Sequence, residues 1–170
     1  MKHSYRFQYK RILLRPLEER DIEELRILRN KNRIFFNDSR IISPEQQKAW
    51  FQHYYDNEND IMFAVELLNR PNEFIGSIAL YHIDRVAKVA EWGRTIIDKE
   101  KAPLKGLGVE ANVAVGCIAF DQLGLKKITA EFLKFNEGAR KIDTRAGAII
   151  VGEDKEHWLV EITPDTICKD

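Results

Sequence analysis

A short turn with two glycines is the feature of this sequence that most clearly suggests chemistry. Residues 104–110 read Leu-Lys-Gly-Leu-Gly-Val-Glu and lead directly into a helical pattern. Glycine has no Cβ, so the backbone N–H groups of such a turn can approach an anion closely. The helix that follows adds unpaired N–H groups and a partial positive charge at its N-terminus. We therefore expect a phosphate or pyrophosphate here, with an ordinary helix-starting turn as the alternative. The backbone that would contact it belongs to Lys105, Gly106, Leu107, Gly108 and Val109.

The segments on either side of the turn complete a longer pattern. A strand-like run, residues 91–97, precedes the turn, residues 119–128 follow its helix, and a β-rich run then ends at Asn136. This arrangement resembles the GNAT superfamily, the acyl-CoA-dependent N-acetyltransferases, over nearly the whole chain and most specifically from residue 91 to residue 147. The two glycines match the signature turn of that family, whereas Pro103 stands where the family has Gln or Arg.

The resemblance implies a fold and a co-substrate. The fold is α/β (α+β), a mixed and mostly antiparallel sheet with helices on both faces, in which two central parallel strands splay apart. By position these are the strand ending near residue 97 and the strand over residues 127–135. The co-substrate is acetyl-CoA, whose pyrophosphate would bind the glycine turn. Its pantetheine amides would pair with the free strand edge at Thr95, Ile96 and Ile97.

Further contacts to the cofactor are expected from four polar side chains. Lys105 is a candidate for a charge-assisted contact to phosphate, with a solvated loop lysine as the alternative. Arg140 and Lys141 are candidates for the same role. Asn136 matches the family and would hydrogen-bond the pantetheine or a bound water during catalysis. A helix cap for the segment that follows Asn136 is an equally good reading, and both roles are compatible.

Acetyl transfer requires that an amine lose a proton, and Glu91 is the candidate base. An acid at this position resembles one in several GNAT subgroups, and a surface glutamate is the alternative. Strand alternation places Glu91 on one face with Gly93 and Thr95, opposite Trp92 and Arg94.

The departing CoA thiolate would gain from a proton donor, and the family often uses a tyrosine. Asp143 occupies that position here. We expect an exposed, ionised Asp143 that cannot donate, so that a water at Asn136 or the hydroxyl of Tyr81 takes its place.

The N-terminal half of the sequence contains the residues that we expect to bind the acceptor amine. Arg29 and Asn30, followed by the pattern of residues 42–51, resemble relatives that acetylate the 4-amino group of a nucleotide-linked deoxysugar in pseudaminic-acid pathways. We expect the acceptor site between the N-terminal helices and the strand over residues 74–84, and assign Arg29, Asn30 and Tyr81 to substrate binding. A second subgroup, similar around Gly147, acetylates N-terminal amines of ribosomal proteins. From a different class, a non-catalytic acyl-CoA-binding module stays open, because the family tyrosine is missing.

The elements that must position these groups follow from local patterns. Strands are predicted over residues 11–15, 61–68, 74–84, 89–97 and 127–135, with a closing hairpin of residues 148–151 and 157–162. Helices are predicted over residues 17–30, 44–55, 107–123 and 137–146. Ser43 caps the second helix in a capping box with Gln46, and Gly124 ends the third. No linker or repeat divides residues 1–170, so one domain is expected.

Composition narrows the partners and the compartment. The 27 basic and 27 acidic side chains balance, so nothing indicates nucleic-acid binding. The sequence contains no run of about 18 apolar residues, so we expect no membrane span, and no signal peptide is evident. Cys117 and Cys168 do not form a disulfide framework, and the four histidines show no metal-ligand spacing, so we expect no metal. We expect a cytoplasmic enzyme that acts on a small amine, an aminosugar nucleotide or a protein N-terminus, and a homodimer is left open.

Overall fold

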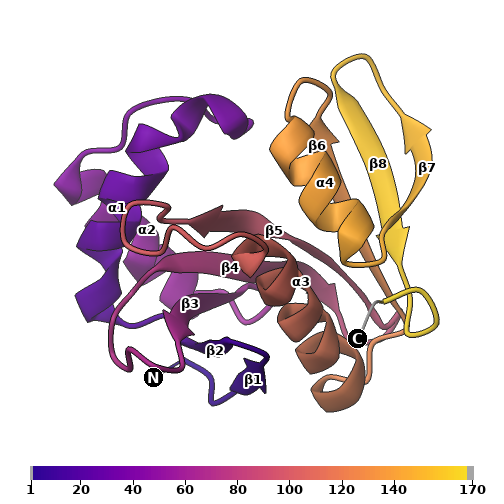
Figure 1. Cartoon of the computed structure of the whole chain (residues 1–170), viewed down its shortest axis with the longest axis horizontal. Helices are drawn as coiled ribbons and strands as arrows, with labels where there is room; N and C mark the ends of the chain where they lie inside the picture. Colours follow the sequence, from indigo (N-terminus) through magenta and orange to yellow (C-terminus); the bar gives the residue numbers. More distant parts are fainter. Residues whose placement is uncertain (1, 168–170) are drawn as a thin grey trace.

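The computed structural model describes residues 2–167, and its centre is one eight-stranded sheet (Figure 1). The strands are arranged in the order β1-β2-β3-β4-β5-β6-β8-β7. Among the described strands, only the contact between β5 and β6 is parallel. The strands are β1 (Phe7–Tyr9), β2 (Ile12–Pro16), β3 (Ile61–Leu67), β4 (Gly76–Asp84), β5 (Val89–Ile97), β6 (Lys127–Leu133), β7 (Ile149–Glu153) and β8 (His157–Ile162).

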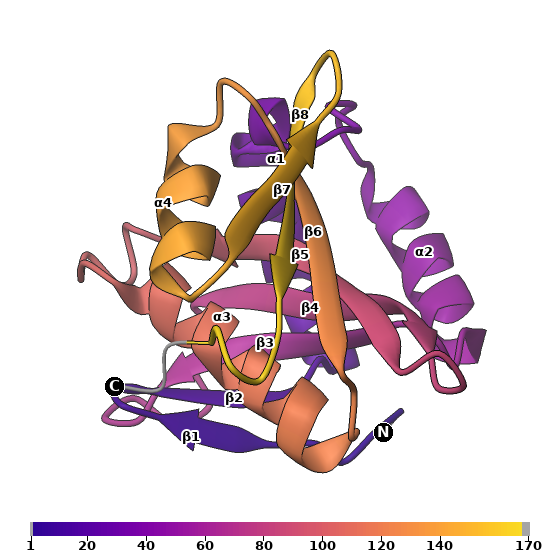
Figure 2. The same cartoon turned by 90° about the vertical axis from the view of Figure 1, so that its right-hand side faces the viewer.

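Helices cover both faces of the sheet. The helices α1 (Ile22–Lys31) and α2 (Pro44–Asp56) lie on one face, and α3 (Leu107–Cys117) and α4 (Glu137–Arg145) lie on the other (Figure 2). Each face has its own apolar core: Leu25, Tyr54 and Ile96 belong to the first, and Trp92 and Ala111 to the second. Within residues 2–167, no helix combines the length and the apolar character that crossing a membrane requires.

The predicted fold class is confirmed. The elements predicted from the strongest local sequence patterns agree best with the structure. Ser43 Oγ accepts from the N–H of Gln46, and the Gln46 side chain accepts from the N–H of Ser43, so the capping box at α2 is present. The strand β1 was missed, because three residues are too few to show alternation. The third helix reaches its predicted end through a π-helical turn, Ile118–Gln122. Cys117 is buried in the core, and Cys168 lies outside the described residues.

The sheet forks at its centre. Only three residue pairs join β5 and β6, and the last of them is Glu91 opposite Thr129. Beyond this pair β5 continues beside β4 alone, while β6 continues beside β8. The expected splaying of the two parallel strands is therefore confirmed, and it begins at Glu91.

A β-bulge in β5 changes which side chains lie on which face. The register with β4 slips between Ser77 and Ala79, so that Arg94 adopts a left-handed conformation with φ of 56°. The extra residue reverses the alternation beyond it. Arg94 therefore lies on the α1–α2 face, and Thr95 turns toward α3. The prediction that Thr95 shares a face with Glu91, opposite Arg94, was wrong for this reason.

Candidate active site

The glycine turn opens α3 with an uncapped N-terminus. Gly106 occupies the cap position with φ of 88°, a left-handed conformation that glycine adopts without steric cost. Because glycine has no side chain, no side-chain cap hydrogen bond from residues 2–167 reaches the first N–H groups of α3. The first N–H groups of a helix have no partner within it, so those of Leu107, Gly108 and Val109 are suited to an anion. Lys105 is exposed beside them.

Two residues that the sequence analysis missed hold this turn in place. Arg11 donates from Nη2 to the carbonyl oxygen of Lys105 at 2.8 Å and from Nε to Glu110 Oε1, also at 2.8 Å. Glu110 is buried in the first turn of α3 and also accepts from the N–H of Arg11 at 3.1 Å. The ion pair thus fastens the glycine turn to the start of β2. Arg11 and Glu110 are 99 residues apart in sequence, so no local pattern could reveal the contact.

The second glycine of the turn serves packing as well. A Cβ added to Gly108 would lie 2.7 Å from Ile142 Cδ1, so the missing side chain lets α4 pack against the first turn of α3. Gly108 is buried, whereas Gly106 is exposed. The two glycines therefore have different roles, since Gly106 sets the conformation of the turn and Gly108 admits the neighbouring helix.

Beyond Glu91, one edge of β5 has no partner strand among residues 2–167. Ile96 and Ile97 are paired with Ser77 and Gly76 of β4, and their other edge faces the space where β6 has diverged. The side chain of Ile96 belongs to the core under α1 and α2, and Thr95 Oγ1 donates to Asn112 Oδ1 of α3 at 3.0 Å. Only the backbone of this segment is therefore available to a ligand in the fork.

Glu91 lies at the branch point of the fork on the α1–α2 face. Its side chain is about one-third exposed, and Oε1 lies 2.9 Å from Nδ1 of His82. Tyr81 is paired with Glu91 across the strands, and its hydroxyl covers Gly93, where an added Cβ would come within 2.7 Å. Burial, assisted by the charge of Glu91, raises the pKa of Tyr81 to about 12, so its hydroxyl keeps its proton at neutral pH.

Arg94, displaced by the bulge, completes this side of the fork. Its guanidinium lies 4.5 Å from the centre of the Tyr81 ring. Nη1 donates to both carboxylate oxygens of Asp60 at 2.9 Å. The pair fixes the position of Tyr81, and the sequence analysis missed it because the bulge is not visible in the strand pattern.

Asp143 lies on the opposite face of the fork, and the prediction that it is exposed was wrong. It is 8% exposed, between α4, α3 and β5. Asn112 Nδ2 donates to its Oδ1 at 2.8 Å. Burial raises the pKa of Asp143 to about 7, although the hydrogen bond from Asn112 and the nearby indole of Trp92 favour the ionised form. The N–H of Trp92 is buried, and its geometry falls short of a hydrogen bond.

The other predicted residues of this half are placed as follows. Asn136 Oδ1 accepts from the N–H of Ala139 at 3.0 Å, so its role as the cap of α4 is confirmed. Its amide nitrogen remains suited to the predicted contact with the pantetheine. Arg140 and Lys141 are exposed on α4, with Arg140 near the ring of Trp158. Their phosphate contacts stay predictions.

Two of the predicted acceptor residues, Arg29 and Asn30, lie on α1, and the third, Tyr81, lies on β4. Arg29 lies 4.0 Å above the Phe36 ring, and its Nη1 is buried without a hydrogen-bond partner among residues 2–167. This burial lowers the pKa of Arg29, against the opposing charge of Asp38. Asn30 uses both ends of its amide on the backbone of Ile42, at 2.9 Å each. Asn30 therefore shapes the loop, and Arg29 is the better candidate for a substrate contact.

The loop after α1 also touches the far arm of the fork. Asn37 Nδ2 donates to Glu131 of β6 at 3.2 Å, and Asn37 Oδ1 lies 2.8 Å from His157 Nε2. Ligand atoms of Glu131, Asp154 and His157 lie within 4.8 Å of one another. Both ring nitrogens of His157 are already hydrogen-bonded, to Asp154 and Asn37, so the cluster is a closed network. The absence of a metal stays a prediction.

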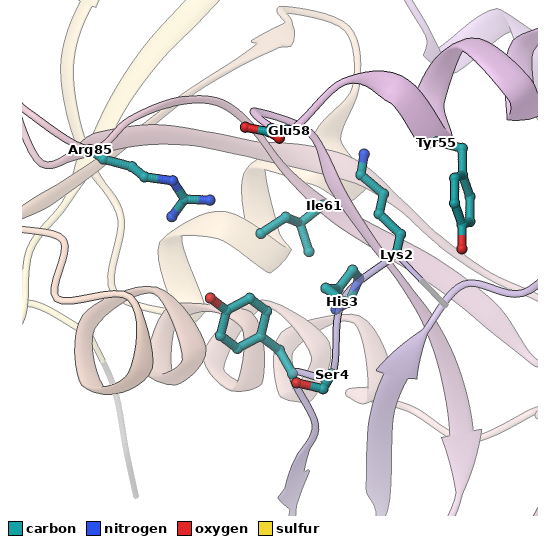
Figure 3. Close-up of a pocket in the computed structure, with 8 residues that line it drawn as sticks. Lys2, His3, Ser4, Tyr55, Glu58, Ile61 and Arg85 are labelled. Carbon is teal, nitrogen blue, oxygen red and sulfur yellow. The ribbon is translucent and has the colours of Figure 1, made fainter.

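Two surface hollows lie away from these residues. One, of about 460 Å³, is lined by Lys2, His3, Tyr55 and Arg85, among others, beside the start of β3 (Figure 3). Lys2 Nζ donates there to the carbonyl oxygens of Tyr54, Asn57 and Asp60. The other, of about 520 Å³, lies between the start of α1 and the end of α2. Neither is lined by a residue of the fork or of the glycine turn, so the fork carries the chemical argument.

Comparisons with known proteins agree with this geometry. The sequence profile of the acetyltransferase (GNAT) domain matches residues 11–149. No curated protein matches the sequence. Among solved structures, FdhC, described as a nucleotide-linked sugar GNAT, superposes with a TM-score of 0.83 at 24% identity, over 96% of this chain and 93% of its own.

Two further structures have similar folds. Spermidine N-acetyltransferase from Vibrio cholerae, solved in complex with CoA and spermine, has a TM-score of 0.79 at 21% identity, over 92% of this chain and 97% of its own. A putative ribosomal-protein-serine acetyltransferase from the same organism has a TM-score of 0.74 at 19% identity, over 96% and 100%. At these identities the likeness shows the fold alone.

Proposed function

The chain belongs to the GNAT acetyltransferase family, and on that premise we propose that it transfers the acetyl group of acetyl-CoA to a primary amine. The observation that carries the proposal is the fork that begins at Glu91, together with the open N-terminus of α3. The fork supplies a free strand edge for an amide-bearing chain, and the helix supplies N–H groups for a pyrophosphate. Acetyl-CoA carries both groups.

The path of the cofactor follows from these two features. The pyrophosphate binds the N–H groups of Leu107, Gly108 and Val109, with Lys105 adding charge from the exposed side. The pantetheine runs along the backbone edge of residues 95–97 and carries the thioester toward the branch point. Asn136 meets the pantetheine from the start of α4, while Arg140 and Lys141 reach the phosphates.

Glu91 is the base of the proposed reaction. An ammonium acceptor must lose a proton before nitrogen can attack the thioester carbonyl, and a carboxylate at the branch point is suited to take it, directly or through water. The carboxylate is held by His82 and keeps contact with solvent. Tyr81, whose hydroxyl stays protonated, lies on the same face and orients the acceptor.

For the acceptor we propose the 4-amino group of a nucleotide-linked deoxysugar. The support is Arg29, a half-buried guanidinium whose Nη1 has no partner among the residues described. Such a group is suited to the diphosphate of a nucleotide sugar. The similar fold of FdhC adds to this support. A protein N-terminus is the alternative, and the putative ribosomal-protein-serine acetyltransferase is the structure that favours it.

A panel of acceptors tests the proposal. Purified protein is incubated with acetyl-CoA and, separately, a nucleotide-linked 4-aminodeoxysugar, spermidine, or a peptide with a free N-terminal serine, and released CoA thiol is measured. We expect the aminosugar nucleotide to be fastest, and Arg29→Gln to raise its KM. If the peptide were acetylated faster than the aminosugar nucleotide, a protein N-terminus would be the acceptor instead. Binding of acetyl-CoA without thiol release from any of the three would favour a non-catalytic module.

A further inference from the structure

Asp143 is the buried acid that the proposed reaction does not yet use. It extends from α4 into the contact of α3 with β5, where Asn112 and Trp92 surround it. Trp92, whose indole lies beside Asp143, is the first residue of β5 after the last pair with β6, so Asp143 lies on the α3–α4 side of the strand where the fork begins. Asn112, which is fully buried, joins Asp143 to Thr95 through hydrogen bonds of 2.8 and 3.0 Å.

Among residues 2–167, no charged side chain on an element packed against Asp143 is placed to offset its charge. On α3, Glu110 is paired with Arg11. On β5, Glu91 and Arg94 lie on the other face, where they contact His82 and Asp60. On α4, the charged neighbours are exposed, namely Glu137, Arg140, Lys141 and Arg145. A carboxyl in such a place is easier to keep neutral than ionised, which is why its pKa rises to about 7.

We propose that Asp143 is the general acid of the acetyl transfer, holding a proton behind the fork and giving it to the departing sulfur of CoA. The proposal rests on the proposed function above, because it needs the thioester in the fork. It assigns the network of Thr95 and Asn112 a positioning role, since Asn112 fixes one oxygen of Asp143 and leaves the other for the donated proton.

The proton and electron pairs balance as follows. The amine nitrogen attacks the thioester carbonyl carbon, a C–N bond forms, and the C–S bond breaks with its electron pair going to sulfur. The carboxyl proton of Asp143 moves to that sulfur, so CoA leaves as a neutral thiol. The proton lost by nitrogen goes to Glu91. Solvent then returns a proton to Asp143 and takes one from Glu91, and no other reactant is consumed.

The direction of this transfer is favourable. A free thiol has a pKa of about 8.5, above the value near 7 that burial gives the carboxyl. A proton therefore passes downhill from the acid to the thiolate. A general acid is most effective when its pKa lies near the working pH, and a carboxyl achieves that only when burial raises its pKa.

The first test needs no acceptor and therefore fails separately from the proposed function. CoA with a free thiol is bound to wild type and to Asp143→Asn, and thiolate formation is followed with pH by ultraviolet difference absorbance against CoA-free protein. An ionised Asp143 beside the sulfur disfavours a second negative charge. We expect the thiol pKa of bound CoA to be about one unit lower in Asp143→Asn. Equal values in the two proteins would overturn the proposal.

The second test is the pH dependence of turnover with the best acceptor of the panel. In wild type, kcat should fall as pH rises through about 7, because the acid loses its proton. Asp143→Asn should be slower by about 10²-fold and lack this fall, with acetyl-CoA affinity by calorimetry unchanged. Asp165→Asn, the same change at an exposed site, should behave as wild type. A variant that keeps the wild-type profile, or one that loses CoA binding, would show a structural role instead.

Discussion

Replacing Asp143 by Asn should make the protein more stable at alkaline pH. A buried carboxylate is costly when no cation pairs with it, and within residues 2–167 the groups that favour the ionised form of Asp143 are the N–H groups of Asn112 and Trp92. An asparagine has nearly the same shape, carries no charge and still accepts from Asn112. The change therefore removes the cost of ionisation and leaves the packing between α3 and α4 in place.

The sign and size follow from proton binding. The pKa of Asp143 is about 7 in the folded state and near 3.8 in the unfolded chain. Between these values the folded state holds the proton and the unfolded state does not, so stability falls as pH rises, by about 1.4 kcal/mol per unit. From pH 5 to pH 8, two units lie in this window, so wild type should lose about 3 kcal/mol that Asp143→Asn keeps.

Urea unfolding at pH 5, 6, 7 and 8 measures this difference. We expect the stability gap in favour of the variant to be about 3 kcal/mol larger at pH 8 than at pH 5, and the gap between the two midpoints of thermal unfolding to be larger by about 10 °C. Asp165→Asn controls for the general loss of one carboxyl. If the stability gap between Asp143→Asn and wild type stayed constant from pH 5 to 8, Asp143 would be ionised in the fold and the reasoning refuted.

Three further predictions concern the fork and the turn. Gly106→Ala should weaken acetyl-CoA binding about tenfold by calorimetry, because a Cβ at φ of 88° costs about 1–2 kcal/mol and distorts the turn; equal affinity would remove this site. Glu91→Gln should lower kcat about 10²-fold with CoA affinity intact, and full activity would reject its role as base. Gly93→Ala should lower kcat without changing CoA affinity, because its Cβ would come within 2.7 Å of the Tyr81 hydroxyl; wild-type kcat would show that the hydroxyl can move freely.

Local signals predicted the elements, and non-local pairing determined the exceptions. The capping box at Ser43 and the helix opened by Gly106 depend on residues within one turn, so sequence alone reveals them. The bulge at Arg94 depends on how β5 meets Ser77 and Ala79 of β4. Such a slip cannot be read from β5 itself, and it moved Thr95 to the other face. Strand alternation is therefore a safe guide only up to the first bulge.

The candidate site divides in the same way. The glycine turn and Glu91 were found from residue type and position, whereas the ion pair of Arg11 with Glu110 joins segments 99 residues apart. For Asp143 a signal did exist. Ala139 and Ala146, four residues before and three after it, are an apolar stripe that helical periodicity carries through Asp143. The resemblance to the family points to the missing tyrosine and says nothing of burial. The helical periodicity is the signal that predicts a buried Asp143 at that position.

The fork explains why two acids in one site can act in opposite senses. Glu91 lies on the α1–α2 face, keeps contact with solvent and is bonded to His82. Asp143 lies behind the next residue of the strand, on the α3–α4 face, where burial raises its pKa. The sheet opens at this point, so the solvated carboxylate of Glu91 and the buried carboxyl of Asp143 lie on opposite faces of it. A ligand that enters the fork would lie between the two groups. One group is thereby suited to take a proton from nitrogen and the other to give one to sulfur.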